Sequence, residues 1–121
     1  MSMIDSPLMR GLERVLDLSS FRQQLIASNL ANVDTPGYRT RDLRQFPGEL
    51  QRAMAGDDEA VFTPVARQVP GLLERPDMNN VSVERESLLM AQNQLRYQVA
   101  IQFLRDQFHT ISSAISGGGS Q

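Results

Sequence analysis

The segment from Ser82 to Ile115 contains neither proline nor glycine, and it constrains the fold more than any other part of the chain. Through it, mainly apolar side chains recur at alternating steps of four and three residues. Such a heptad repeat is typical of a helix that buries a stripe against another helix. The spacing therefore predicts one helix over residues 82–116, about 34 residues or roughly 51 Å long at ~1.5 Å per residue.

This predicted helix carries two stripes on opposite sides, whereas a surface helix of a monomer needs only one apolar face. We expect one stripe to pack within the chain and the other between subunits of an assembly. Our assignment gives the first seam to packing within the chain and the second to packing between subunits, although the sequence does not decide which is which. The first seam is Met90, Gln94, Tyr97, Ile101, Leu104, Phe108, Ile111 and Ile115, and the second seam is Leu88, Leu95, Val99 and Phe103.

A second helix is predicted near the start of the chain. Ser6 suits the N-cap, and Pro7 suits the first helical position, where its missing N–H costs nothing. Apolar residues then follow at helical spacing as far as Leu30. We expect a helix from Pro7 to about Asn32 that pairs antiparallel with the C-terminal helix.

The N-terminal helix should stop at a turn cluster that runs from Asn32 to Tyr38. Pro36 disfavours the helical conformation at Thr35, and Gly37 can supply the positive φ that a type II turn requires. Asparagine side chains can bond free backbone groups at a helix end, and the Tyr38 ring can anchor a turn. We expect a structural corner that packs on neighbours, built from Asn29, Asn32, Thr35, Pro36, Gly37 and Tyr38.

Residues 39–81 contain most of the prolines and show no strong element. Weak strand character appears at Val61–Thr63 and Val65–Val69, and one or two helical turns are possible over Pro47–Ala55. The predicted organisation is one mainly α-helical domain whose long terminal helices pair as a coiled-coil-like hairpin. Its parts are residues 1–38 (helix and turn motif), 39–81 (irregular centre), 82–116 (long helix) and 117–121 (flexible tail).

Composition excludes several classes of function. The net charge of −2 offers no basic excess to neutralise phosphates, so we expect no nucleic-acid partner. The chain has no cysteine, which excludes disulfides and thiolate chemistry. Its start lacks the pattern of a secretory signal peptide, and it has no apolar run long enough to predict a membrane span.

Candidate chemical groups are sparse. His109 is the single histidine and has no partner at metal-ligand spacing. The acidic run Asp57–Glu59 lacks the spaced oxygen ligands of a calcium loop, and Gly117–Gly119 has no helix after it to cradle a phosphate. We therefore expect no catalytic residues, no metal, no cofactor and no small-molecule ligand. The charged cluster of Arg39, Arg41, Asp42 and Arg44 is either ion-paired and solvated or contacts adjacent subunits.

Two stretches resemble a known family. Residues Ser28 to Arg39 read SNLANVDTPGYR and resemble the ANxANxxTPGY signature of bacterial flagellar rod and hook proteins, with Ser28 where alanine is usual. Residues 79–86 and 93–98, together with the short length of the chain, resemble the proximal-rod members of that family. The two matches lie at the two ends of the chain.

The resemblance implies a structural subunit that polymerises helically into the proximal rod, the drive shaft needed for flagellum assembly and motility. Its implied partners are other copies of itself, other rod proteins, and the basal-body adaptor and export gate at the rod base. Its implied location is the periplasmic rod, reached through the flagellar type III apparatus without a cleaved signal. The turn motif could instead act directly as an export signal. A coiled-coil adaptor or secretion chaperone, and more distantly a small enzyme, are the alternatives from other classes.

Overall fold

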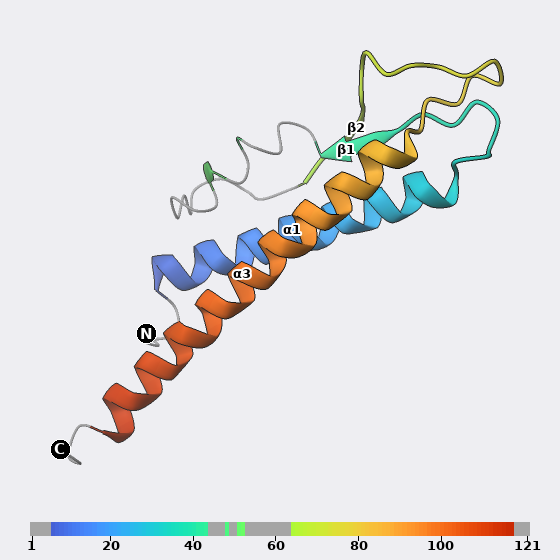
Figure 1. Ribbon diagram of the computed structural model, residues 1–121. Helices are drawn as coiled ribbons and strands as arrows, with labels where there is room; N and C mark the ends of the chain where they lie inside the picture. The colour runs from blue at the N-terminus through green and yellow to red at the C-terminus, as the bar shows by residue number, and fades with distance from the viewer. Residues whose placement is uncertain (1–5, 44–47, 49–50, 53–63, 118–121) are drawn as a thin grey trace.

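A computed structural model describes residues 6–43, 48, 51–52 and 64–117. The elements in chain order are α1 (Pro7–Ala31), β1 (Arg41–Leu43), β2 (Ala66–Gln68) and α3 (Val83–Ser116). The two helices lie side by side and run antiparallel, while the strands and the loops before α3 gather at the end where α1 stops (Figure 1). The predicted mainly α-helical hairpin is confirmed.

Both helices begin where the sequence predicts, because their caps are local. The Ser6 hydroxyl accepts a bond from the Met9 N–H at 3.1 Å, and the Ser82 hydroxyl accepts one from the Arg85 N–H at 3.2 Å. Each serine satisfies a backbone donor that the first helical turn leaves free. At the other end of α3, Gly117 is the C-cap, and its N–H donates to the Ser113 carbonyl at 2.7 Å.

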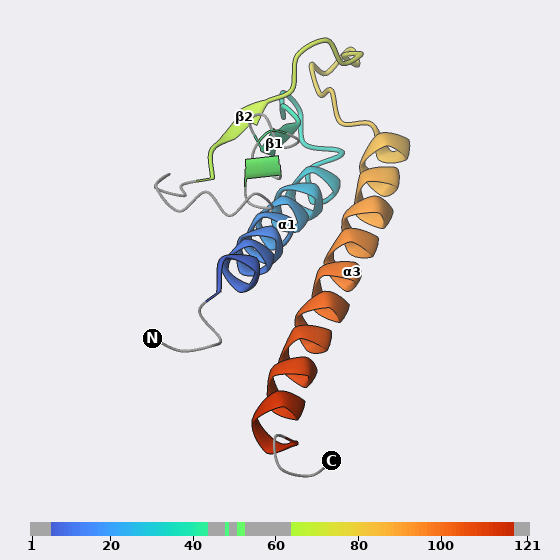
Figure 2. The same ribbon diagram turned by 90° about the vertical axis from the view of Figure 1, so that its left-hand side faces the viewer.

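The two helices differ in length, since α1 has 25 residues and α3 has 34. Because the chain connects them at the end where α1 stops, the extra length of α3 appears at its C-terminal end. Figure 2 shows this end of α3 continuing past the start of α1.

The face of α3 that packs on α1 lies between the two predicted seams. Its fully buried residues are Glu86, Asn93 and Ala100, one every seven residues. Opposite them, Val15 and Leu18 of α1 form a small apolar core together with Ala100 and with Leu43 of β1. The packed face of α3 therefore repeats every seven residues, and two of its three buried positions are polar.

A two-stranded antiparallel sheet covers part of α1. Asp42 of β1 lies opposite Arg67 of β2, and Leu43 opposite Ala66. β2 falls inside the predicted stretch Val65–Val69, whereas β1 occupies a stretch that the sequence indicated only as a charged cluster. Residues 53–63, which include the acidic run and the predicted strand Val61–Thr63, lie outside the described residues, as does part of the predicted turn over 47–55.

Candidate functional site

The predicted turn forms at the end of α1. The Tyr38 N–H donates to the Thr35 carbonyl at 3.1 Å, which closes a four-residue turn around Pro36 and Gly37. Gly37 has φ +75°, a left-handed conformation that other residues adopt only with strain. Its N–H donates to the Asp77 carbonyl at 2.9 Å, so the turn is also joined to the loop that precedes α3.

Asn29 is the central side chain of this corner and is fully buried. Its amide nitrogen donates to the Arg41 carbonyl at 2.8 Å and to a Glu86 carboxylate oxygen at 2.6 Å. Its amide oxygen accepts from the Arg41 N–H and from the Tyr38 hydroxyl, both at 3.1 Å. One side chain thus joins α1 to the turn, to β1 and to α3.

Asn32 has the role that the sequence suggested for it at the helix end. As the C-cap of α1, it donates through its backbone N–H to the Ser28 carbonyl at 3.1 Å and through its side chain to the same carbonyl at 2.8 Å. Its amide oxygen accepts from the Thr35 hydroxyl at 3.0 Å. Carbonyls in the last turn of a helix lack intrahelical partners, so these bonds stabilise the end of α1.

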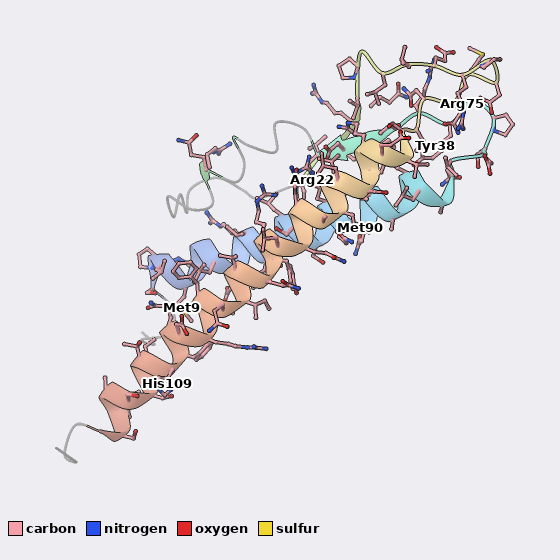
Figure 3. The ribbon with its side chains drawn as sticks, in the orientation of Figure 1. Met9, Arg22, Tyr38, Arg75, Met90 and His109 are labelled. Atoms are coloured by element: carbon pink, nitrogen blue, oxygen red, sulfur yellow. The ribbon has the colours of Figure 1, made fainter. Side chains whose placement is uncertain are left out.

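Asn79 and Asn80 complete the corner, and both are buried. The Asn79 side chain donates to the carbonyls of Asn32 and Thr35 at 2.9 and 2.8 Å. The Asn80 side-chain oxygen accepts from the Thr40 N–H at 2.7 Å. Figure 3 shows this end of the molecule, with Tyr38 and Arg75 labelled near each other. Neither asparagine was among the predicted site residues. The Asn-Asn pair just before the Ser82 cap was the available signal.

Charged side chains extend the network along one side of the corner. Arg22 of α1 donates two bonds to the Asp42 carboxylate, at 2.9 and 2.8 Å. Arg85 of α3 lies 3.8 Å from the same carboxylate and donates to the buried Glu86 at 2.6 Å. A bidentate arginine–carboxylate pair fixes orientation as well as contributing energy. This network locks α1, β1 and α3 into one geometry.

The residues of the charged cluster that the sequence indicated make different contacts. Asp42 pairs with Arg22, and Arg39 lies 3.3 Å from Glu74, while Arg41 is exposed and contributes its backbone to Asn29. Arg44 lies outside the described residues. Asp42, the acidic residue of this cluster, is therefore ion-paired within the chain.

The two flanks of the helix pair differ in chemistry. One flank has an apolar groove of about 600 Å³, and the other has a polar groove of about 340 Å³. We call them the apolar groove and the polar groove. The apolar groove is lined mainly by Leu12, Val15, Leu95, Val99, Ala100 and Phe103. The polar groove is lined by Ser19, Ser20, Gln23, Asn93, Gln94, Tyr97 and Gln98.

The second seam is exposed along its whole length. Leu88, Leu95, Val99 and Phe103 keep 59%, 62%, 46% and 55% of their surface in contact with solvent. The last three also line the apolar groove. Four large apolar side chains on one helix face form an apolar patch that a monomer leaves uncovered.

The first seam has mixed surroundings. Met90, Ile101, Leu104 and Ile111 are half-buried, whereas Gln94, Tyr97, Phe108 and Ile115 are exposed. Gln94 and Tyr97 line the polar groove, and Phe108 and Ile115 lie near the C-terminal end of α3. Which seam packs within the chain and which between subunits stays a prediction.

Arg96 is a partly buried cation beside the apolar groove. Burial, and secondarily the like charge of Arg22, lower the pKa of Arg96, which lines the apolar groove. An arginine remains charged at neutral pH even so, because its ordinary pKa is very high. The apolar groove therefore contains a positive charge.

Other chemistry is sparse in the part of the chain that the structure describes. His109 is exposed, and no group of three His, Cys, Asp or Glu side chains among the described residues is arranged to hold a metal ion. None of the described helices combines the length and apolar character needed to cross a membrane.

The sequence at the corner matches a known protein family. Residues 18–39, which contain the end of α1 and the turn, match the sequence model of a family described as flagella basal body rod protein. The chain is 31% identical to the flagellar basal body rod protein FlgB of Salmonella typhimurium, over 91% of this chain and 94% of that protein. It is 30% identical to FlgB of Escherichia coli over the same shares, and 25% identical to FlgB of Bacillus subtilis over 90% of this chain and 93% of the relative.

Proposed function

This chain belongs to the FlgB family of flagellar basal body rod proteins, and from that premise we propose that it polymerises helically into the proximal rod. The family is one of structural rod proteins rather than an enzyme family. In this proposal the rod is a drive shaft, and the chain is needed for flagellum assembly and motility.

The observation that carries the proposal is the exposed second seam. Leu88, Leu95, Val99 and Phe103 are all about half exposed or more on a helix whose other side is already packed on α1. Burying apolar surface contributes about 25 cal/mol per Å², so covering this patch between subunits would stabilise an assembly. A rod subunit needs such a surface.

The corner supplies the stiffness that a shaft requires. Buried hydrogen bonds from Asn29 and Asn79, and the bidentate pair of Arg22 with Asp42, join α1, the turn, β1 and the loop before α3. Fully satisfied buried polar networks specify one geometry. In our proposal the corner therefore holds the two helices at a fixed angle while torque passes through them, and it packs on neighbouring subunits.

The proposed partners are other copies of the chain, other rod proteins, and the adaptor and export gate at the rod base. We propose that the chain reaches the periplasmic rod through the flagellar type III apparatus. The adaptor and chaperone alternatives gain no support from the relatives described above, which are all named as rod proteins.

The test uses a strain that lacks the gene, complemented with Leu95→Asp, Phe103→Asp or the wild-type chain. Both residues are more than half exposed, so the folded subunit should tolerate the charge. We expect normal protein levels but no rods by electron microscopy and no swimming. Ser87→Asp is the matched control, because Ser87 is exposed on α3, lines neither groove, and is not three or four residues from any member of the second seam. Normal rods and swimming with both seam variants would refute the proposal.

A further inference from the structure

We propose that the apolar groove of one copy receives the projecting C-terminal end of α3 from a second copy, in a head-to-tail contact. The inference rests on the proposed function and names the two surfaces that would join like subunits.

The register of the helix pair shows how far α3 projects. The Asn29 side chain bonds Glu86 at 2.6 Å, which sets these two residues level with each other. Pro7 precedes Asn29 by 22 residues, and 22 residues beyond Glu86 the antiparallel α3 reaches Phe108. Roughly two further turns of α3 therefore extend past the start of α1. Figures 2 and 3 show this projecting end, and His109 is labelled on it in Figure 3.

The projecting end has an apolar stripe of its own. Phe108, Ile111 and Ile115 are spaced by three and four residues and so lie on one face. Phe108 is 42% exposed and Ile115 is 68% exposed. No basic residue stands in the last turn of α3. The partial negative charge of the helix C-terminus is therefore not offset from within the helix.

The apolar groove is complementary to such a helix end. Buried Val15 and Ala100 form its floor, and the more exposed Leu95, Val99 and Phe103 rise beside them. Its volume of about 600 Å³ is in the range of ordinary binding clefts. Arg96 lines the groove and would favour the negative end of an incoming helix. Amphipathic helices commonly bind in grooves of this kind through anchors at such spacing.

The asymmetry between the two surfaces favours a second copy of the chain as the occupant. The groove and the projecting end are different surfaces on one molecule, so the contact between them is head-to-tail. After one contact forms, one copy still has a free groove and the other a free helix end. Heterologous contacts that do not close into a ring generate open helical arrays. A rod subunit requires this property, and a two-fold dimer lacks it.

The chain has no cysteine, so engineered thiols test the contact without background. Val99→Cys places a thiol in the groove, and Ile111→Cys places one on the projecting stripe. Ser113→Cys is the matched control, because Ser113 is exposed on the projecting end about half a turn from the stripe. Pairs of single-cysteine chains are co-expressed, basal bodies are isolated, and a short bismaleimide cross-linker is added.

We expect cross-linked dimers when Val99→Cys and Ile111→Cys are combined, and at least tenfold less product when Ser113→Cys replaces Ile111→Cys. A chain that carries both Val99→Cys and Ile111→Cys should give a ladder of higher oligomers. Dimers formed mainly between two Val99→Cys chains would indicate a two-fold contact and would overturn the inference. So would equal cross-linking of Ile111→Cys and Ser113→Cys.

The proposed function is scored separately in the same preparation, through recovery of the wild-type chain in basal bodies. That recovery does not depend on the cross-link pattern. If the wild-type chain is absent from basal bodies, the proposed function fails, and cross-linking of the concentrated purified chains then decides the contact.

Discussion

Replacing Asn29 with alanine should destabilise the folded chain more than any other single change at the corner. The side chain makes four hydrogen bonds, two with the Arg41 backbone, one with the Tyr38 hydroxyl and one with the Glu86 carboxylate. A neutral hydrogen bond contributes ~1 kcal/mol, and a bond to a charged group contributes about 1.5–3 kcal/mol. Because such losses are not additive within a network, we expect a fall in unfolding free energy of roughly 3–5 kcal/mol.

The assay is urea unfolding of the purified chain, followed by circular dichroism at 222 nm. Asn32→Ala is the matched control, because Asn32 is only half-buried and its side chain bonds one carbonyl and one hydroxyl. The control should lose about 1 kcal/mol. A loss below 1 kcal/mol for Asn29→Ala, or equal losses for the two variants, would refute the reasoning that Asn29 holds the corner together.

Three further predictions concern two ion pairs and the turn. Arg22→Ala should lower the unfolding free energy by about 2–4 kcal/mol, because it leaves the Asp42 carboxylate, 14% exposed, without its bidentate partner. Arg39→Ala should cost less than about 0.5 kcal/mol in the same urea assay, since its pair with a glutamate is a third or more exposed on each side. Gly37→Ala should cost about 1–2 kcal/mol through its positive φ alone, because no atom lies within 4 Å of an added Cβ. Equal effects of the two arginine variants, or a Gly37→Ala variant as stable as wild type, would contradict these estimates.

The helix ends could be predicted from the sequence because their causes are local. Ser6 and Ser82 each bond a backbone N–H three residues ahead, and Gly117 follows the last turn of α3. The positive φ of Gly37 was predictable for the same reason, since Pro36 and Gly37 together favour one type of turn. Four or five neighbouring residues are enough to predict each helix end and the turn.

The buried face of α3 was harder to predict because it is largely polar. A search for apolar spacing finds the stripes on either side of it and passes over Glu86 and Asn93. Both side chains bond partners on α1. Glu86 accepts from Asn29, and Asn93 donates to the Ser19 carbonyl at 2.7 Å. Burial of a polar group depends on a partner far away in the sequence, which periodicity alone does not show.

The same limit explains what the sequence missed at the corner. Asn79 bonds carbonyls that lie 47 and 44 residues earlier, and Arg22 pairs with an aspartate 20 residues later. β1 forms in a charged stretch because β2 pairs with it from the far side of the central segment. Long-range pairing overrides local propensity at each of these places.

The most direct test of the central claim is the amount of the chain recovered in purified basal bodies when the second seam is made polar. The double variant Leu95→Asp with Phe103→Asp is compared with wild type and with Ser87→Asp by quantitative immunoblot, at matched cellular levels. If the exposed seam joins rod subunits, recovery of the double variant should fall at least tenfold while Ser87→Asp matches wild type. Recovery of the double variant at the wild-type level would contradict the account.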